Sequence, residues 1–251
     1  MTTKVAVVGA SGTMGRLITQ VIDSEPGFEV VAALGSSSPL SDMLGADVAV
    51  DVTRPGVSQS VVDFAVENGL SVLVGTSGWS GERIAALQRT VAERPELGVV
   101  IVPNFSLGSV LATRFATMAA RFYESIEIIE AHHAGKVDSP SGTAVRTAEL
   151  IAEARRDLGP VAAPHADQRA RGQQVGSVPI HSLRMQGVIA RQDVIFGGTG
   201  EVLTLTHETI SSAAYEQGIR IALRALPAAT GVTVGLDRLI DLDGGSIAGE
   251  K

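Results

Sequence analysis

Two adjacent imidazoles and an ammonium form the densest group of proton-transferring side chains in the chain: His132, His133 and Lys136. A histidine changes its charge close to neutral pH, whereas an unperturbed lysine stays protonated. A lysine also provides a compact countercharge for a carboxylate. The types and spacing of these three residues therefore indicate acid chemistry on a negatively charged molecule.

An anion site is predicted a few residues further on. Pro140 has no amide hydrogen to donate, and the residues after it, Ser141, Gly142 and Thr143, open a predicted helix. Amides and hydroxyls at the positive end of a helix bind anions such as carboxylates. A simpler interpretation is a histidine pair that caps a strand beside a solvated lysine. That interpretation suits any single histidine, but it leaves the cluster as a whole unexplained.

Local patterns place this cluster between a strand and a helix. Residues 125–131 alternate β-branched and acidic side chains, which is typical of a strand, and residues 143–156 have helical periodicity. We therefore expect His132 and His133 where the strand ends, and the anion site where the helix begins.

The stretch from residue 128 to residue 144 closely resembles the signature of the dihydrodipicolinate reductase family, which serves lysine and diaminopimelate biosynthesis. The family's typical form is Glu-x-His-His-x-x-Lys-x-Asp-x-Pro-Ser-Gly-Thr-Ala, and every fixed position is met here. The resemblance implies two catalytic acids, His132 and Lys136. It also implies a substrate-binding group, which consists of His133, Ser141, Gly142 and Thr143.

A glycine-rich turn near the N-terminus predicts a dinucleotide site. The apolar strand at residues 5–8 is followed by three glycines in the spacing G-x-x-G-x-x-G and then by an amphipathic helix to about residue 23. Glycines let a pyrophosphate approach the backbone, and the following helix directs its amides at it. This spacing is one residue longer than the usual Rossmann fingerprint and is a weak signal by itself. The predicted cofactor-binding residues of the turn are Gly9, Ala10, Ser11, Gly12, Thr13 and Met14.

The pattern after this turn strengthens the prediction, because strand-like and helix-like segments alternate. Four further strands are expected at residues 28–34, 47–52, 71–75 and 98–102, with helices at 57–68 and 81–94. This order predicts an α/β fold with a Rossmann-like, doubly wound parallel sheet. Ligands of such sheets bind beyond the carboxyl ends of the strands.

Three turns at those carboxyl ends are similar to turns that line the cofactor in the same family: residues 51–55, 75–79 and 103–106. Without the resemblance each is a loop rich in turn-forming residues. With it, the predicted cofactor-binding residues gain Gly75, Thr76, Ser77, Pro103, Asn104 and Phe105.

The choice between NADH and NADPH stays open in the sequence. The acidic residue that binds the ribose at the end of the second strand is missing, since Leu34 leads into a glycine and three serines. Serine hydroxyls accommodate a 2′-phosphate, but no arginine lies in this loop. The family's usual arginine near the nicotinamide is also replaced, by Ser212, although Tyr215 keeps the aromatic residue that follows it.

A second domain is expected between residues 106 and 212. A helix at 106–123, a mobile loop at 158–177 and strands at 179–185, 188–196 and 201–207 accompany the histidine strand in an open, mixed sheet. Residues 212–226 predict a last helix, and 232–239 an edge strand of the first sheet. The predicted domains are a dinucleotide-binding domain, residues 1–105 plus 213–251, and a substrate-binding and oligomerisation domain, residues 106–212. The resemblance implies that the open sheet assembles a homotetramer.

Composition excludes several classes of protein. The 251 residues contain no cysteine, which excludes disulfides, thiolate metal sites and a cysteine nucleophile. The net charge of −7 argues against a nucleic-acid binder. We see no membrane span or leader segment and no metal-ligand spacing among the histidines, and we expect a cytoplasmic enzyme of a small molecule.

These observations and the resemblance predict an NAD(P)H-dependent reductase. Its reaction would convert 4-hydroxy-tetrahydrodipicolinate, via dihydrodipicolinate, to tetrahydrodipicolinate, a cyclic dicarboxylate. One alternative is a redox-sensing module that binds the dinucleotide without catalysis, although no basic stripe or helix-turn-helix pattern supports it. Another is a reductase of the same architecture with a different substrate.

Overall fold

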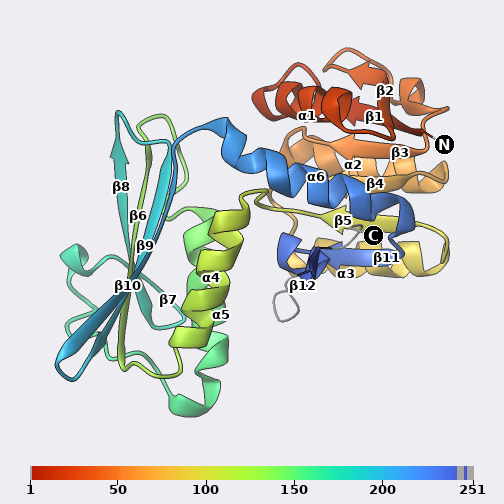
Figure 1. The fold of residues 1–251 in the computed structure, drawn as a ribbon. Helices are drawn as coiled ribbons and strands as arrows, with labels where there is room; N and C mark the ends of the chain where they lie inside the picture. Colours follow the sequence, from red (N-terminus) through yellow and green to blue (C-terminus); the bar gives the residue numbers. More distant parts are fainter. Residues whose placement is uncertain (1, 242–245, 248–251) are drawn as a thin grey trace. The chain divides into compact units, whose positions relative to one another are not determined.

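A computed structural model describes residues 2–241 and 246–247 of the chain. The remaining residues of the predicted C-terminal segment, 242–245 and 248–251, lie outside the described part. The chain divides into two compact units (Figure 1). Unit 1 comprises residues 1–107 and 215–251, and unit 2 comprises residues 108–214.

Unit 1 is built on a six-stranded, fully parallel sheet with the strand order β11-β5-β4-β3-β1-β2. The predicted Rossmann-like, doubly wound fold is thereby confirmed. The edge strand expected at residues 232–239 is present beside β5 as β11, but it ends at Val234 and the 3-10 turn η6 (Leu236–Leu239) follows it. The strands are β1 (Thr3–Val8), β2 (Phe28–Leu34), β3 (Val48–Asp51), β4 (Ser71–Val74), β5 (Gly98–Ile101) and β11 (Gly231–Val234).

Helices cover both faces of this sheet, which explains why its strands are continuous apolar runs. Ala6 and Val8 of β1 pack in one core with α2 and α3, whereas Val5 and Val7 are buried on the other face, on the side of α1 and α6. The helices are α1 (Thr13–Ser24), α2 (Pro55–Glu67), α3 (Gly81–Ala92) and α6 (Glu216–Ala225). Short 3-10 turns and a two-strand pair complete the unit: η1 (Leu40–Met43), η5 (Leu226–Ala228), η6 (Leu236–Leu239), β12 (Ile240–Asp241) and β13 (Ser246–Ile247). The 3-10 turn η4 (Ser212–Tyr215) lies where the chain passes from unit 2 to unit 1.

The register of the parallel strands places their carboxyl ends in line. Val8, Asp51, Val74 and Ile101 are successive partners across β1, β3, β4 and β5. The loops that follow these four strands therefore begin side by side. The order of connection reverses between β1 and β3, and a crevice for a ligand forms at such a switch point.

Unit 2 is a five-stranded mixed sheet with two helices on one of its faces (Figure 1). The central strand β6 runs parallel to β8 and antiparallel to β9, as expected for the predicted open, mixed sheet. The order is β10-β9-β6-β8-β7. The elements are α4 (Leu107–Ala119), β6 (Ser125–His133), α5 (Gly142–Ala154), η2 (Arg156–Leu158), η3 (Arg169–Arg171), β7 (Gln173–Val175), β8 (Val178–Met185), β9 (Ala190–Gly198) and β10 (Glu201–Thr209).

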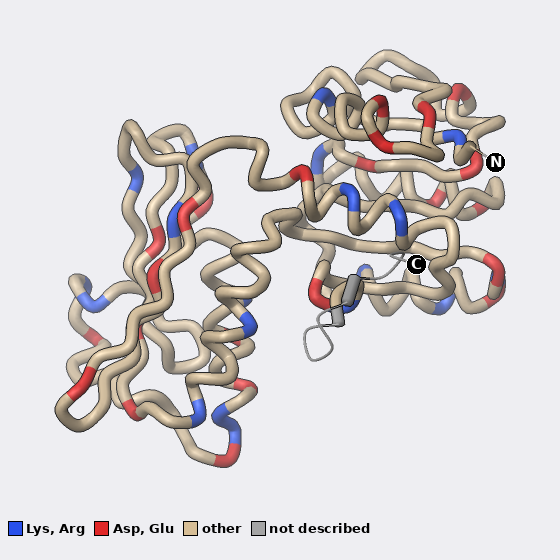
Figure 2. Tube along the Cα trace, in the orientation of Figure 1, with Lys and Arg blue, Asp and Glu red and all other residues tan. Residues whose placement is uncertain are grey.

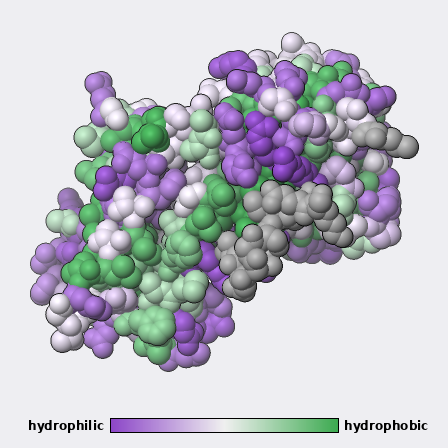
Figure 3. Space-filling model, viewed as in Figure 1, coloured by the Kyte–Doolittle hydropathy of each residue, from purple (hydrophilic) through white to green (hydrophobic). Residues whose placement is uncertain are grey.

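Alternation along β6 divides its side chains between the two faces. Ile126 and Ile128 are fully buried in the core beneath α4 and α5, and Glu130 and His132 continue the same face. The opposite face is more open, and acidic and basic residues lie close together on the strands of this sheet (Figure 2). Apolar side chains also reach the surface of unit 2 (Figure 3).

Two segments of unit 2 differ from the sequence-based expectation. The helix expected to reach residue 123 ends at Ala119, because the guanidinium of Arg155 takes the carbonyls of Ala120 and Tyr123. The segment 158–177, expected to be a loop, contains η3 and the short strand β7. An ion pair between Arg171 and Glu127 fastens this segment to the sheet.

No helix among the described residues is long and apolar enough to cross a membrane.

A buried carboxylate connects α6 to the end of α1 within unit 1. Glu25 accepts hydrogen bonds from Arg220 and Arg224, both at 2.7 Å. Burial would raise the pKa of Glu25, but the two arginines outweigh burial and lower it. A carboxyl with a lowered pKa stabilises the fold above its unfolded pKa, and this stabilisation disappears as the pH falls through the folded value.

We therefore expect Glu25→Gln to lower the free energy of unfolding by about 1 to 3 kcal/mol at pH 7, because two charged hydrogen bonds are weakened. The difference from the wild type should shrink as the pH falls below 4. Thermal unfolding across this pH range measures it. Asp23→Asn changes an exposed carboxyl two residues away and serves as the control. Equal destabilisation by both substitutions would contradict the assignment.

Candidate active site

The glycine turn of unit 1 leaves the first amides of α1 without a side-chain cap. The N-cap residue is Gly12, whose backbone is extended and which has no side-chain oxygen. The turn itself is held by the end of β2, since the amides of Gly9 and Ala10 donate to the carbonyl of Leu34 at 2.9 and 3.1 Å. An uncapped helix start in a rigid turn fits the pyrophosphate of a dinucleotide.

The three glycines of the turn have different roles. Gly9 has a φ of +91°, where L side chains are strained, and a Cβ there would lie 2.4 Å from the carbonyl oxygen of Val52. A Cβ on Gly15 would lie 2.1 Å from the carbonyl oxygen of Gly9, so this position requires close packing of the helix on the turn. A Cβ on Gly12 meets one atom at 3.3 Å and the residue is exposed. Packing within the turn therefore does not require a glycine at position 12, unlike at positions 9 and 15.

The remaining predicted residues of this turn differ in exposure. Ser11 and Thr13 are exposed, whereas Ala10 and Met14 are half-buried. The turn therefore offers hydroxyls and amides to the solvent beside Gly12.

A buried carboxylate at the end of β3 orders the neighbouring loops. Asp51 is fully buried and accepts hydrogen bonds from the amide of Thr53 at 3.1 Å, from its hydroxyl at 2.6 Å, and from the hydroxyl of Ser58. Ser58 in turn accepts from the indole of Trp79 at 2.9 Å. The hydroxyl of Thr76 accepts from the Thr53 amide at 2.8 Å. The loops after β3 and β4 are thereby joined.

The loop after β5 is joined to the same group by an aromatic ring. Phe105 is 3% exposed, and a Cβ on Gly75 would lie 2.7 Å from its ring. Phe105 and the buried Thr76 thus pack inside the loops, while Ser77 and Pro103 are exposed and Asn104 accepts from the amide of Ser106 at 2.9 Å. The structure brings the three predicted cofactor loops to one edge of the sheet.

In unit 2, His132 and His133 are the last two residues of β6, as the sequence predicts. Because neighbours in a strand point to opposite faces, only His132 lies on the face covered by α5. His132 is half-buried and His133 is exposed. The two imidazoles therefore have different surroundings, and a single role for both is not supported.

Glu130, two residues before His132, is the most strongly bonded carboxylate of unit 2. It is fully buried. Arg184 of β8 donates to both of its oxygens at 2.8 and 2.9 Å, the amide of Ser141 donates at 3.1 Å, and Nδ1 of His132 lies 2.6 Å away. Burial would raise the pKa of Glu130, but these bonds and one from Ser182 lower it to about 2. Glu130 is consequently ionised at neutral pH.

Opposing effects determine the pKa of the His132 imidazole. Burial lowers its pKa, and the bond to Glu130 raises it; the charges of Lys136 and Arg184 lower it further, and the net shift is downward. The imidazole is therefore neutral at pH 7. A carboxylate can only accept, so Nδ1 carries the proton and Nε2 is left with its lone pair.

Lys136 lies in the turn that leaves β6. Its amide donates to the carbonyl of His133 at 3.0 Å, and its Nζ lies 2.7 Å from a carboxylate oxygen of Asp138. The ammonium is partly buried and the carboxylate is exposed. A substrate carboxylate can compete for such a cation, because an exposed ion pair contributes little.

Ser141 caps α5 rather than facing outward. Its hydroxyl accepts from the amide of Ala144 at 3.3 Å, its amide donates to Glu130, and it is 2% exposed. Gly142, the next residue, is exposed, and Thr143 is half-buried. The exposed part of the predicted anion site is therefore the helix start at Gly142.

Three charged residues of these networks have no role predicted from the sequence: Glu130, Arg184 and Asp51. The spacing of Glu130 and His132, two residues apart on one face of a strand, could have predicted their contact. Asp51 was visible only as part of a turn. Arg184 had no signal, because its position depends on the pairing of β6 with β8.

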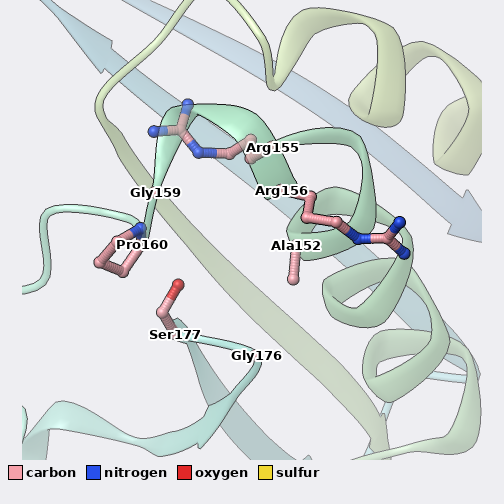
Figure 4. A pocket seen from close by; sticks show the side chains of 7 residues that line it. All are labelled: Ala152, Arg155, Arg156, Gly159, Pro160, Gly176 and Ser177. Atoms are coloured by element: carbon pink, nitrogen blue, oxygen red, sulfur yellow. The ribbon is translucent and has the colours of Figure 1, made fainter.

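One pocket of unit 2, about 330 Å³, lies at the C-terminal end of α5 (Figure 4). Its two guanidinium groups are already bonded, Arg155 to two carbonyls and Arg156 to Glu153. It therefore offers no group for the chemistry of the predicted site. It is lined by Ala152, Arg155, Arg156, Gly159, Pro160, Gly176 and Ser177.

A parallel sheet with an uncapped glycine turn, accompanied by a unit that carries an imidazole, an ammonium and a helix start, defines a dinucleotide-dependent oxidoreductase. Two family models match nearly the whole described chain. Dihydrodipicolinate reductase, N-terminus, matches residues 3–105, and Dihydrodipicolinate reductase, C-terminus, matches residues 108–240. The chain belongs to the dihydrodipicolinate reductase family. Its cofactor is NADH or NADPH.

Named relatives agree with this membership. The chain is 68% identical to a 4-hydroxy-tetrahydrodipicolinate reductase of Clavibacter michiganensis subsp. michiganensis, over 97% of this chain and 88% of the relative. It is 42% identical to the reductase of the same name from Streptomyces avermitilis, over 96% and 98% of the two chains. A solved structure of dipicolinate-bound dihydrodipicolinate reductase from Paenisporosarcina sp. TG-14 is similar with a TM-score of 0.81 and 29% identity, covering 96% of this chain and all of that one.

Among the described residues, no group of three or more histidine, aspartate or glutamate side chains is arranged to hold a metal ion.

Two of the three glycines of the turn, Gly12 and Gly15, give a matched pair of tests. Gly12→Val places a branched side chain where a pyrophosphate would approach, and we expect weaker NADH binding with an unchanged melting temperature. Gly15→Ala places a Cβ against the backbone of the turn, and we expect a lower melting temperature. Fluorescence titration with NADH and thermal unfolding measure both. Wild-type NADH affinity in folded Gly12→Val would refute the placement.

Proposed function

We propose that this chain catalyses the NAD(P)H-dependent reduction of 4-hydroxy-tetrahydrodipicolinate, via dihydrodipicolinate, to tetrahydrodipicolinate. Family membership and the names of its relatives support this reaction. The observation that carries the residue roles is the cluster at the end of β6. There an imidazole, an ammonium and a helix start are joined through one buried carboxylate.

The cofactor, when bound, supplies the hydride. The residues of unit 1 hold and orient it. Amides at the start of α1 bind the pyrophosphate, and the loops after β4 and β5 face the rest of the dinucleotide. The dinucleotide-binding residues that we propose are Gly9, Ala10, Ser11, Gly12, Thr13, Met14, Gly75, Thr76, Ser77, Pro103, Asn104 and Phe105.

The substrate class is a cyclic dicarboxylate, and unit 2 binds it. Support comes from the relative whose structure contains dipicolinate. One carboxylate lies at the start of α5, where Gly142 and Thr143 follow the cap Ser141. The other lies near His133 and Lys136, whose ammonium supplies a countercharge.

The proton comes from Lys136 in this proposal. The imidazole of His132 is neutral, with its Nδ1 proton held by Glu130, so its Nε2 accepts a hydrogen bond rather than donating one. The side chain of Lys136 is an ammonium, which only donates. His132 therefore orients and tunes the reacting group, while Lys136 donates.

The competing hypothesis of a same-fold reductase for another substrate has specific grounds. A scyllo-inositol dehydrogenase from Lactobacillus casei has a similar fold, with a TM-score of 0.60 at 12% identity. The deciding experiment follows NADH oxidation by its absorbance, with dihydrodipicolinate synthase supplying the labile substrate. Oxidation of NADH only in the presence of the synthase product supports the proposal. Its absence, with another cyclic substrate reduced instead, overturns it.

Lys136→Ala and His132→Ala test the residue roles. General acid catalysis contributes about 100- to 10,000-fold, so we expect kcat to fall on this scale in Lys136→Ala and by a smaller factor in His132→Ala. Lys136→Ala should also raise the KM for the dicarboxylate, because a carboxylate loses its countercharge. NADH affinity should stay unchanged in both. Near wild-type turnover in both variants, with chemistry limiting the rate, would contradict these roles.

We also propose that the enzyme is a cytoplasmic homotetramer and that the open face of the sheet in unit 2 forms its interface. Alternation along the strands places exposed apolar residues on the face opposite α4 and α5. They are Leu183, Met185 and Val202, with 48%, 50% and 69% of their surfaces exposed. Burial of such a face on a second copy is favourable.

Leu183→Glu should therefore lower the mass of the assembly in sedimentation velocity, because a charge is placed in the interface. Phe122→Glu is the matched control, since Phe122 is 84% exposed but follows α4 on the other face. We expect its mass to equal that of the wild type. A monomeric wild-type chain would refute the tetramer, and dissociation only by Phe122→Glu would move the interface to the other face.

A further inference from the structure

We propose that Arg184 is a positioning residue of this reductase: through Glu130 it holds the imidazole of His132 and the loop of Lys136 in the arrangement used for reduction. The inference rests on the roles proposed above for His132 and Lys136. It adds two residues, neither of which has a place among the proposed catalytic or substrate-binding groups.

The pairing of the strands brings Arg184 to this place. β6 and β8 run in parallel, and Arg184 is the register partner of His132. Paired residues of neighbouring strands project from the same face, so the guanidinium lies on the face that α5 covers. From there it forms a two-pronged contact with Glu130, at 2.8 and 2.9 Å. A lysine could not make this contact, because it has a single nitrogen.

The same guanidinium also braces the loop between β6 and α5. One of its nitrogens donates to the carbonyl oxygen of Asp138 at 2.6 Å. Asp138 is the residue whose carboxylate pairs with Lys136. Glu130 meanwhile accepts from the amide of Ser141, where the loop ends. The arginine and the carboxylate thus hold the loop at its beginning, in its middle and at its end.

Neither residue is suited to transfer a proton itself. Glu130 is fully buried and ionised, and an arginine stays protonated in proteins. What the pair determines is orientation. A carboxylate at Nδ1 of His132 fixes the ring and its tautomer, as in other sites where a carboxylate orients an imidazole. Nε2 is thereby directed away from Glu130, and Lys136 is held by the same contacts.

Arg184 is largely buried together with the carboxylate that it contacts. Its side chain is 18% exposed, and its Nε has no hydrogen-bond partner among the described residues. Its two terminal nitrogens donate to the carboxylate of Glu130 and to the carbonyls of Asp138 and Leu183.

The experiment compares four variants of the full chain. Arg184→Lys keeps the charge without the two-pronged geometry, Glu130→Gln removes the charge of the carboxylate, and Glu130→Gln with Arg184→Met removes both charges together. Arg156→Met is the matched control, since Arg156 pairs with Glu153 at the other end of α5. The double variant is needed because Arg184→Met alone leaves a buried charge unpaired, which can unfold the chain.

The readouts are kcat, KM, NADH affinity, affinity for dipicolinate as a probe, and the ¹⁵N NMR shifts of His132. In the wild type we expect the proton on Nδ1. In the double variant we expect a mixture of tautomers and a kcat lowered about 100-fold, the scale of a misplaced catalytic group. NADH affinity should be unchanged, and Arg184→Lys should recover part of kcat. The control should match the wild type in every readout.

Two results would overturn the inference. The first is a wild-type His132 that carries its proton on Nε2, a measurement that needs no variant to fold. The second is a folded double variant with wild-type kcat and wild-type tautomer. Failure of the proposed function gives a different result, since the wild type itself would then not reduce the substrate and His132→Ala would change nothing.

Discussion

A carboxylate that is buried away from water needs positive charge and hydrogen-bond donors around it, and Glu130 is such a carboxylate. Burial of an ion costs several kcal/mol even after the protein relaxes. Glu130 is stabilised by a guanidinium from β8, an amide from the start of α5 and an imidazole from its own strand. These partners belong to three elements of unit 2, so the end of β6, the loop after it and the first turn of α5 have one common arrangement. The chemistry of the loop depends on this arrangement.

Unit 1 also contains a buried carboxylate with several hydrogen bonds, at the carboxyl end of its parallel sheet. Asp51, at the end of β3, is fully buried and bonded to Thr53 and Ser58, and through them to Thr76 and Trp79. In both units a buried carboxylate at the carboxyl end of an inner strand orders the loops that contain the predicted functional residues. The groups that we propose to meet the ligands, such as the amides at Gly12 and Gly142, can therefore be uncharged, because the buried carboxylates keep their loops in place.

The sequence predicted the strands of unit 1 well, because buried parallel strands are continuous apolar runs bounded by turn residues. The predicted end of β6 at the two histidines and the start of α5 were also correct, since a proline and a serine cap mark the helix. The predicted end of α4 was wrong. The helix ends early because of a contact with Arg155, which lies at the end of α5, more than thirty residues later in the chain. The role of Arg184 was invisible for the same reason. Local patterns specify elements, whereas contacts between distant residues specify where elements stop and what their charged side chains meet. The assignment of individual site residues remains a prediction.

The distance in sequence between Glu130 and Arg184 also has a consequence for biosynthesis. The two residues are separated by 54 positions. A ribosome adds about 5 to 20 residues per second, so Glu130 leaves it about 3 to 11 seconds before its guanidinium partner. During this interval β6 has neither of its neighbouring strands, and a charge that later lies in the core is hydrated. Unit 2 therefore completes the contacts of the proposed catalytic loop only after most of its chain has been made. A nascent chain arrested within β8 would contain His132 and Lys136 but not the guanidinium that orders their loop.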